Sequence, residues 1–466
     1  MTSEKPRIGL MGIMQDLYDA MLPGITERQS DYARAIAAQL GDVAEVIFPK
    51  AVRNRADAEE VVAQFEREGL DGILIVMLTY GPAMNVTRAL VNTRLPLMLA
   101  NTQPERSITP AWDMGDMTYN QGVHGAQDQA NALVRAGVAL PVITDDWRSE
   151  TFKRQFEDWA RAAATVSRLR RMKVAIFGYA MNGMGDIRVD ETAMLRRLGP
   201  EIRFLATGDL YRAMQAATDA EVAQVIEQEN DWFEVDPRLS AAQREESARY
   251  QVALKRILDE GGYGAYSTHF GAIAEDGRFS FLPVAAASNL MAQGYGFGAE
   301  GDACSAILVA AGHLLAGDAH FTEMYAMDFD RDTALLSHMG EGNWKVARTD
   351  EPVRLIDRPL GIGGLDNPPT VLFRIQPGPA TLTSLVPLGG EHFRLVLSEG
   401  EIIADSPVMP SLEMPYGEYR PSTGVRQALN GWLRAGGTHH KCLNRGHIAN
   451  RWRLFCELAG VELVEV

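Results

Sequence analysis

The amino-acid sequence predicts an α/β protein whose C-terminal part is an antiparallel, β-rich region. Three observations support this fold class. Apolar runs alternate with amphipathic helices in the first third of the chain, and a second α/β pattern begins at residue 173. Beyond about residue 350, alternating and β-branched residues with Gly and Pro between them replace helical periodicity. At 466 residues, the chain is long enough for two or three domains.

In the first third, short apolar runs predict strands, and segments with helical spacing predict the helices between them. The strands are expected at 7–13, 44–49, 72–78 and 96–102, and the helices at 27–40 and 57–69. Buried apolar runs separated by amphipathic helices indicate a parallel sheet covered on both faces. Ligands bind such sheets beyond the carboxyl ends of the strands. Those positions hold Gln15 to Tyr18, Thr79 and Tyr80, and Asn101 to Gln103.

The rest of the chain continues the α/β pattern and then departs from it. A charged helix is expected at 145–172, followed by strands at 173–180 and 201–208 with a helix at 190–199 between them. From there to about residue 318 the pattern is mostly helical. The segments 370–388 and 392–403 predict strands of the β-rich region, and a helix is expected at 450–460.

The composition argues against some classes of binding partner and indicates the cellular compartment. A formal net charge of −16 argues against binding to nucleic acid or to an anionic membrane, although a local cleft could still bind an anionic small molecule. The three cysteines, Cys304, Cys442 and Cys456, are too few for a disulfide framework. The N-terminus lacks signal-peptide features, and the longest apolar stretch, 303–317, is too short to span a bilayer and predicts a buried helix. We therefore expect a cytoplasmic protein.

The segment "GYGFGAEGD" (294–302) places Gly296, Gly298 and Gly301 in the spacing of the dinucleotide fingerprint. That fingerprint works only where the glycines leave a strand and open a helix. The preceding segment is rich in Ala, Met and Gln and predicts a helix, and a glutamate next to bound phosphates would be out of place. Nicotinamide binding by this loop is therefore kept only as an alternative.

Glu300 is the residue of interest in this segment, because glycines on both sides let the backbone turn its carboxylate into a cleft. Downstream lie Glu323, His338 and the adjacent pair His439 and His440. Two Glu and two His are a usual ligand set for a divalent first-row metal, with open positions for substrate oxygens. Each residue also has a simpler interpretation, such as a solvated charge for Glu300 or a hydrogen-bonded, half-buried imidazole for His338. Spacing alone does not bring these residues together, so both interpretations stay open at this point.

These segments resemble the L-arabinose isomerase family, in one order along nearly the whole chain. The two specific matches are "GYGFGAEGD" and "AGGTHH", and shorter supporting matches are "QDLY", "NQGVHG", "FTEMY", "LLSHM", "LGIGGLDNP" and "QPGPA". The resemblance implies a flavodoxin-like N-terminal α/β domain (1–170), a central α/β domain (171–318) and a C-terminal antiparallel β-barrel domain (319–466). It also implies assembly into a homotrimer or homohexamer.

The resemblance further implies a divalent cation, usually Mn²⁺, bound by two glutamates and two histidines. On this sequence the ligands are Glu300, Glu323, His338 and His440, with His439 supporting the turn. The implied reaction is aldose–ketose interconversion of a sugar such as L-arabinose, with the metal polarising the carbonyl. Glu300 and Glu323 would then move a proton between C1 and C2 through a cis-enediol. A metal-assisted hydride shift is the rival mechanism.

The same resemblance implies a sugar pocket, and in a trimer the N-terminal domain of one subunit would complete the site of its neighbour. The pocket residues it implies are Gln15, Leu17, Tyr80, His124, Met181 and Phe270.

The chain also departs from the family pattern close to these residues. The run "HMGEGNWKVA" (338–347) replaces a Leu-Glu-Val-Cys-Pro type run, and Asp16 stands where family members commonly have a histidine. The sugar is therefore left open, and Glu341 and Trp344 are either new substrate contacts or ordinary loop residues. The alternatives to an isomerase are a non-catalytic sugar-binding protein, a metal-dependent epimerase and a nicotinamide oxidoreductase.

Overall fold

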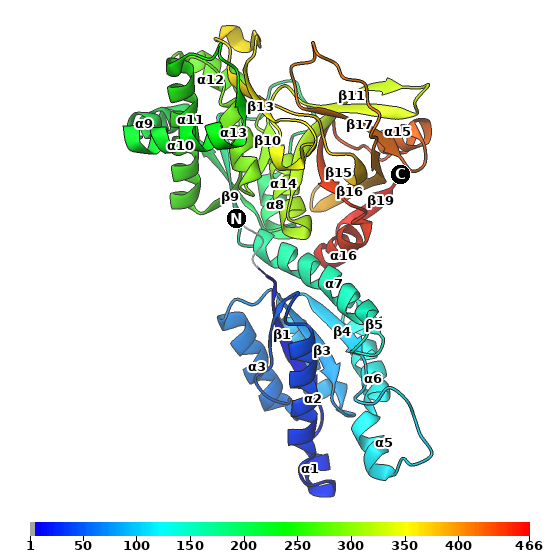
Figure 1. Cartoon of the computed structure of the whole chain (residues 1–466). Coiled ribbons are helices and arrows are strands. Elements are labelled where there is room, and N and C mark those ends of the chain that lie inside the picture. The colour runs from blue at the N-terminus through cyan, green and yellow to red at the C-terminus, as the bar shows by residue number, and fades with distance from the viewer. Residues whose placement is uncertain (1–4) are drawn as a thin grey trace. The chain divides into compact units, whose positions relative to one another are not determined.

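The computed structural model describes residues 5–466 (Figure 1). Its internal contacts define two compact units. The barrel unit comprises Leu169–Ala449 and Gly460–Val466, and the N-terminal unit runs up to Arg168 and includes Asn450–Ala459. The expected three domains, with limits at residues 170 and 318, stay a prediction. The N-terminal stretch that lacks signal-peptide features begins with residues 1–4, which lie outside the described residues.

The N-terminal unit contains one five-stranded parallel sheet. Its strands are β1 (Arg7–Ile13), β2 (Glu45–Ile47), β3 (Gly72–Met77), β4 (Leu97–Asn101) and β5 (Val142–Thr144). The order β2-β1-β3-β4-β5 is that of the flavodoxin-like doubly wound fold, which confirms the expectation. The three-residue strand β5 was not predicted, because its segment is too short to show a pattern.

Helices cover both faces of this sheet. Alternate residues of β1 enter different apolar clusters, since Ile8 and Leu10 pack in one and Met11 and Ile13 in the other. This alternation explains why the strand is a continuous apolar run in the sequence. The helices of the unit are α1 (Leu17–Met21), α2 (Ile25–Gln39), α3 (Arg55–Arg67), α4 (Thr87–Asn92), α5 (Met114–Asn120), α6 (Gly122–Arg135), α7 (Glu150–Leu169) and α16 (Ala449–Ala459), with a 3₁₀ turn η1 (Ala83–Asn85).

The barrel unit begins with a four-stranded parallel sheet in the order β10-β9-β6-β7. Its strands are β6 (Lys173–Phe177), β7 (Glu201–Leu205), β9 (Tyr263–Thr268) and β10 (Gly296–Ala299). The surrounding helices are α8 (Glu191–Arg197), α9 (Thr207–Gln215), α10 (Asp219–Trp232), α11 (Ala241–Gly261), α12 (Phe270–Asp276), α13 (Val284–Ala292) and α14 (Ala303–Ala316). The region up to residue 318 is therefore mostly helical, as expected, but it contains three unpredicted strands. Small residues and glycines hid β9 and β10, and the third strand, β8 (Glu234–Val235), is only two residues long. A small sheet joins β14 (Pro369–Leu372), β13 (Arg354–Asp357) and β8 (Glu234–Val235).

The C-terminal part of the barrel unit is a closed antiparallel β-barrel of six strands. Its strands are β11 (Ala319–Asp328), β12 (Thr333–Ser337), β15 (Gly378–Gly389), β16 (His392–Ile402), β17 (Tyr416–Pro421) and β18 (His440–Arg445). The ring closes because β15 pairs with both β16 and β18. The barrel confirms the predicted fold class, although β11 and β12 begin before the change of texture seen in the sequence.

A few further elements complete the barrel unit. They are β19 (Glu462–Glu465), which pairs parallel to β16, the helix α15 (Val425–Arg434) and the 3₁₀ turns η2 (Trp344–Val346) and η3 (Ile362–Gly364). The apolar stretch 303–317 forms the buried helix α14, as predicted. Among residues 5–466, no helix combines the length and the apolar character needed to cross a membrane.

Candidate active site

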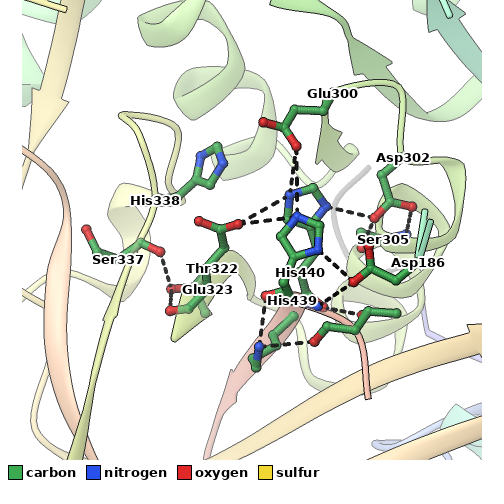
Figure 2. A network of polar contacts seen from close by, with 12 residues as sticks. Asp186, Glu300, Asp302, Ser305, Thr322, Glu323, Ser337, His338, His439 and His440 are labelled. Carbon is green, nitrogen blue, oxygen red and sulfur yellow. Dashed lines mark hydrogen bonds and ion pairs between the residues drawn. The ribbon is translucent and has the colours of Figure 1, made fainter. Parts of the chain in front are cut away.

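Two carboxylates and three imidazoles converge in the barrel unit (Figure 2). Glu300 lies in the turn between β10 and α14. Glu323 lies on β11, and His338 directly follows β12. His440 is the first residue of β18, and His439 directly precedes it. The parallel sheet therefore supplies one carboxylate, and the barrel supplies the other four groups.

The strand register of the barrel brings three of these groups together. Glu323 on β11 lies opposite His440 on β18. On its other side, Glu323 lies opposite Ser337 of β12, and His338 is the next residue. Residues that face each other across an antiparallel pair have Cβ atoms about 4.5–5.5 Å apart. Residues far apart in sequence thus meet at fixed positions of a hydrogen-bonded ladder.

Glu300 has a left-handed backbone with φ of 63°, an uncommon conformation for a residue other than glycine. Holding a non-glycine residue there costs on the order of 1 kcal/mol, so the surrounding structure must impose it. Gly301 follows with φ of 81°, and a side chain on it would collide with the backbone of Tyr179 and Ala180. The turn after β10 is therefore built to aim the Glu300 carboxylate.

The other two glycines of the fingerprint spacing lie inside the buried strand β10 and not in a loop. A Cβ on Gly298 would lie 2.8 Å from the backbone nitrogen of Ala306, and a Cβ on Gly296 would lie 2.7 Å from the Cβ of Ala310. Both positions need glycine because α14 packs directly on the strand. The spacing is thus explained by close packing of helix on strand, without a dinucleotide.

Figure 2 shows the carboxylates of Glu300 and Glu323 facing the adjacent imidazoles of His439 and His440. His440 Nε2 lies 3.6 Å from Glu300 Oε2 and 3.6 Å from Glu323 Oε1. His439 Nε2 lies 3.9 Å and 3.5 Å from the same two oxygens. The ring centroids of His338 and His440 are 6.0 Å apart. One small cation could bridge groups spaced in this way.

Each of the three imidazoles is held at Nδ1 by its own carboxylate. These contacts are His440–Asp302 at 2.8 Å, His439–Asp186 at 2.7 Å and His338–Glu341 at 2.7 Å. A carboxylate at Nδ1 leaves Nε2 as the nitrogen that faces the site, which is the usual support of a metal-binding histidine. Asp186 and Asp302 were not expected from the sequence, although Asp302 stands only two residues after Glu300.

Several buried polar atoms of the cluster have no hydrogen-bond partner. They are Nε2 of His439, Nε2 of His440 and Oε2 of Glu300. Buried polar atoms are normally paired, so these atoms point to a missing ligand. The potential ligand atoms of the cluster form two groups, and within each group all atoms lie within 4.8 Å of one another. One group is Glu300, His439 and His440, and the other is Glu323, His338 and His440. The structure therefore brings the four predicted ligands together and adds His439, which was expected only to support the turn.

Electrostatic coupling within the cluster shifts the proton affinities of its members. Burial opposes charge on His439, but the nearby carboxylate of Glu300, the hydrogen bond to Asp186 and the charge of Glu323 raise its pKa to about 9. Burial would raise the pKa of Glu300, yet the neighbouring histidines hold it below its usual value. Protons and a cation would compete for the same atoms, so the affinity for a metal should fall as the pH is lowered.

Two of the predicted pocket residues lie beside this cluster. The backbone nitrogen of Met181 donates a hydrogen bond of 2.9 Å to the Glu300 carbonyl oxygen. Phe270 lines a cavity of about 50 Å³ together with Glu300 and His338. Much of the remaining wall is apolar and includes Leu282, Pro283, Val284, Leu360 and Ile362.

The other four predicted pocket residues belong to the N-terminal unit. Gln15 follows β1 and Tyr80 follows β3, so both lie at the carboxyl end of that sheet. The rings of Tyr80 and His124 stack with centroids 4.7 Å apart, and Leu17 is 57% exposed. Their role as pocket residues stays a prediction.

Comparison with known proteins gives matches along almost the whole chain. Residues 5–171, 173–318 and 318–462 match the N-terminal, central and C-terminal domains of L-arabinose isomerase, respectively. L-arabinose isomerase 1 of Bacillus licheniformis is 32% identical over 438 residues, which cover 91% of this chain and 86% of the relative. The L-arabinose isomerase of Nocardioides sp. is 32% identical over 408 residues, covering 85% and 80%, and that of Clostridium beijerinckii is 27% identical over 455 residues, covering 95% and 91%.

Together, the α/β sheets, the closed barrel and these matches define an aldose–ketose isomerase. Enzymes of this class are intramolecular oxidoreductases that act on sugars. The chain belongs to the L-arabinose isomerase family.

Proposed function

We propose that this chain is a divalent-metal-dependent isomerase that converts L-arabinose or a related aldose to its ketose by proton transfer through an enediol. The observation that carries the proposal is the convergence of Glu300, Glu323, His338 and His440 around buried atoms without partners. The choice of sugar rests on relatives that are named L-arabinose isomerase.

The donor set suits a first-row divalent cation, and we propose Mn²⁺. Two carboxylate oxygens, which are hard ligands, and two imidazole nitrogens, which are borderline, form a mixed set of the kind that such ions accept. Glu300, Glu323, His338 and His440 would hold the ion, and it would polarise the sugar carbonyl as a Lewis acid.

The two glutamates would also carry the proton. Because Glu300 has a pKa below its usual value, it is ionised at neutral pH and suits the removal of the proton beside the carbonyl. Glu300 would return this proton to C1, the neighbouring carbon of the enediol. Glu323, in its acid form, would donate a proton to the carbonyl oxygen and take the proton of the C2 hydroxyl, so that both groups are restored. Each carboxylate lies 3.6 Å from His440 Nε2. Such a division of roles requires the site to keep the proton affinities of the two carboxylates apart.

We further propose that the protein acts as a homotrimer or homohexamer in the cytoplasm. In that assembly Gln15, Leu17, Tyr80 and His124 of one subunit would complete the pocket of its neighbour. The exposed Leu17 and the paired rings of Tyr80 and His124 lie at the end of the sheet where doubly wound folds bind ligands, which supports this arrangement. Native mass spectrometry would give the number of subunits directly.

The function is tested by assaying ketose formation from a panel of aldopentoses, aldohexoses and 6-deoxyhexoses. The protein is stripped with EDTA and assayed with and without added Mn²⁺. We expect activity only with the metal and with L-arabinose among the best substrates. Incorporation of solvent deuterium into the product would support the enediol route, and its absence would favour the hydride shift. Binding of a sugar without turnover would favour the non-catalytic alternative, and an aldose product would favour an epimerase.

A further inference from the structure

The segment His338–Val346, where this chain departs from the family pattern, is held by buried hydrogen bonds on several sides. Its backbone donates at Gly342 and Asn343, and the Asn343 side chain donates to a carbonyl of β11. The three bonds are Gly342 N to Ser288 Oγ at 3.1 Å, Asn343 N to His320 Nδ1 at 3.1 Å and Asn343 Nδ2 to Ala319 O at 2.8 Å. A loop tied to α13 and β11 in this way has little freedom to move.

Trp344 anchors the same segment through its ring. The indole Nε1 donates a hydrogen bond of 3.2 Å to Asn289 Oδ1 on the buried helix α13. The ring centroid lies 5.1 Å from that of Trp232 and 5.5 Å from that of Phe233. Trp344 thus packs against the core of the barrel unit, as an anchor and not as a substrate contact.

Glu341, unlike the rest of the segment, contacts one of the histidines of the site. Its Oε2 accepts a hydrogen bond of 2.7 Å from His338 Nδ1, and its side chain is only 14% exposed. Arg358, which is buried, donates from Nη1 to the carbonyl oxygen of Met339, and its positive charge lies close enough to act on Glu341. The carboxylate is therefore held by its bond to His338, and the positive charge of Arg358 favours its ionised form.

We propose that this segment is a rigid brace and that Glu341 is the residue that positions the His338 imidazole for the cation. The inference rests on the proposed function, because it concerns the nitrogen that His338 presents. A neutral imidazole carries one N–H, and a carboxylate can only accept a hydrogen bond. Glu341 therefore selects the tautomer protonated at Nδ1 and leaves the lone pair of Nε2 for the cation. A negative charge at Nδ1 also makes Nε2 a stronger donor to a metal.

The test compares Mn²⁺ binding to the EDTA-stripped protein and its variants, measured from the electron paramagnetic resonance signal of the free ion. Removing an outer carboxylate typically lowers metal affinity about 10–100-fold, so we expect a loss of this size for Glu341→Ala. The Mn²⁺ affinity of Glu341→Gln should lie between those of Glu341→Ala and the unmodified chain, because the amide oxygen still accepts a hydrogen bond from His338 Nδ1 but carries no charge. Glu391→Ala is the matched control, since Glu391 is a half-exposed residue paired with Arg196 away from the site.

A second readout separates positioning from a merely structural role. Long-range ¹H–¹⁵N spectra of the histidine rings in the stripped protein should show His338 protonated at Nδ1 in the unmodified chain and in Glu341→Gln. The spectra should show a mixture of tautomers in Glu341→Ala. If Glu341→Ala does not fold, the test rests on Glu341→Gln alone. A Glu341→Gln variant that binds Mn²⁺ as tightly as the unmodified chain then overturns the proposal.

The two proposals fail in different ways. Mn²⁺ binding that is unchanged in both Glu341 variants overturns the positioning role and leaves the isomerase proposal intact. Absence of Mn²⁺ binding to the unmodified chain overturns the metal site itself. An unmodified chain in which His338 carries its proton at Nε2 would likewise overturn the role of Glu341.

Discussion

Glu323 and His440 face each other across the pairing of β11 with β18, and Glu323 Oε1 lies 3.6 Å from His440 Nε2. Their separation is set by a hydrogen-bonded ladder, which holds side chains more firmly than a loop does. Glu300 reaches the same nitrogen from a different sheet, through the strained turn after β10. The site is thus assembled from two rigid frames within the barrel unit.

Replacing Glu300 or Glu323 with Gln should reduce isomerisation by at least about 100-fold, because the amide cannot accept the proton that the carboxylate moves. The fold should persist, since Gln has nearly the same shape. The measurement is ketose formation at saturating Mn²⁺ alongside thermal unfolding. Glu391→Gln serves as the control and should keep full activity. Near-native turnover in either site variant would remove that residue from proton transfer.

His440→Asn should weaken Mn²⁺ binding more than His439→Asn does. His440 is fully buried and its Nε2 lies between both carboxylates, so it belongs to both groups of possible ligands. Losing an outer hydrogen-bond partner can lower metal affinity by roughly 100-fold, and losing a direct ligand should lower it by at least as much. A metal titration of the two variants gives the order, and the reverse order would make His439 the ligand.

Gly298→Ala should destabilise the protein by about 1–3 kcal/mol, the usual cost of forcing a methyl group into a closely packed position. The new Cβ would lie 2.8 Å from Ala306 N, on the helix that packs against β10. Gly185→Ala is the matched control, because nothing lies within 4 Å of a Cβ there, and its change should stay within about 0.5 kcal/mol. Denaturant unfolding monitors both variants, and equal midpoints would contradict the packing role of Gly298.

His313 should make the protein less stable in mild acid. Burial lowers its pKa from 6.5 to about 4, and its Nδ1 accepts a hydrogen bond of 3.2 Å from Ala319 N. A histidine whose pKa is lowered by folding contributes stability above pH 6.5, and this is lost as the pH falls from 6.5 towards 4. The full loss is about 3 kcal/mol. His313→Asn keeps an acceptor but does not titrate, so its unfolding free energy should depend less on pH across this window. If the unfolding free energy of His313→Asn depends on pH as steeply as that of the unmodified chain, His313 is not the group responsible.

The sequence predicted the α/β part of the fold well, because its strands are buried on both faces. The run at 7–13 coincides with β1, and the runs at 72–78 and 96–102 lie within a residue of β3 and β4. Strands made of small residues escaped notice. β10 consists of Gly296–Ala299 and has glycines where α14 packs on it, so its sequence looks like a loop.

The candidate site was predictable as a set of residues, but its arrangement was not. The resemblance to a family pointed to Glu300, Glu323, His338 and His440, which spacing alone could not bring together. Asp186 supports His439 from a loop before α8, far away in sequence, and no local pattern marks such a partner. The left-handed backbone of Glu300 was likewise hidden, because glutamate seldom adopts it.

The metal site is tested most directly by anomalous diffraction from crystals of the EDTA-stripped protein soaked in Mn²⁺. We predict one strong manganese peak per subunit, within bonding distance of carboxylate oxygens of Glu300 and Glu323 and of the Nε2 atoms of His338 and His440. A peak elsewhere, or no peak between these four side chains at saturating Mn²⁺, would contradict the proposed metal centre and the isomerase chemistry built on it.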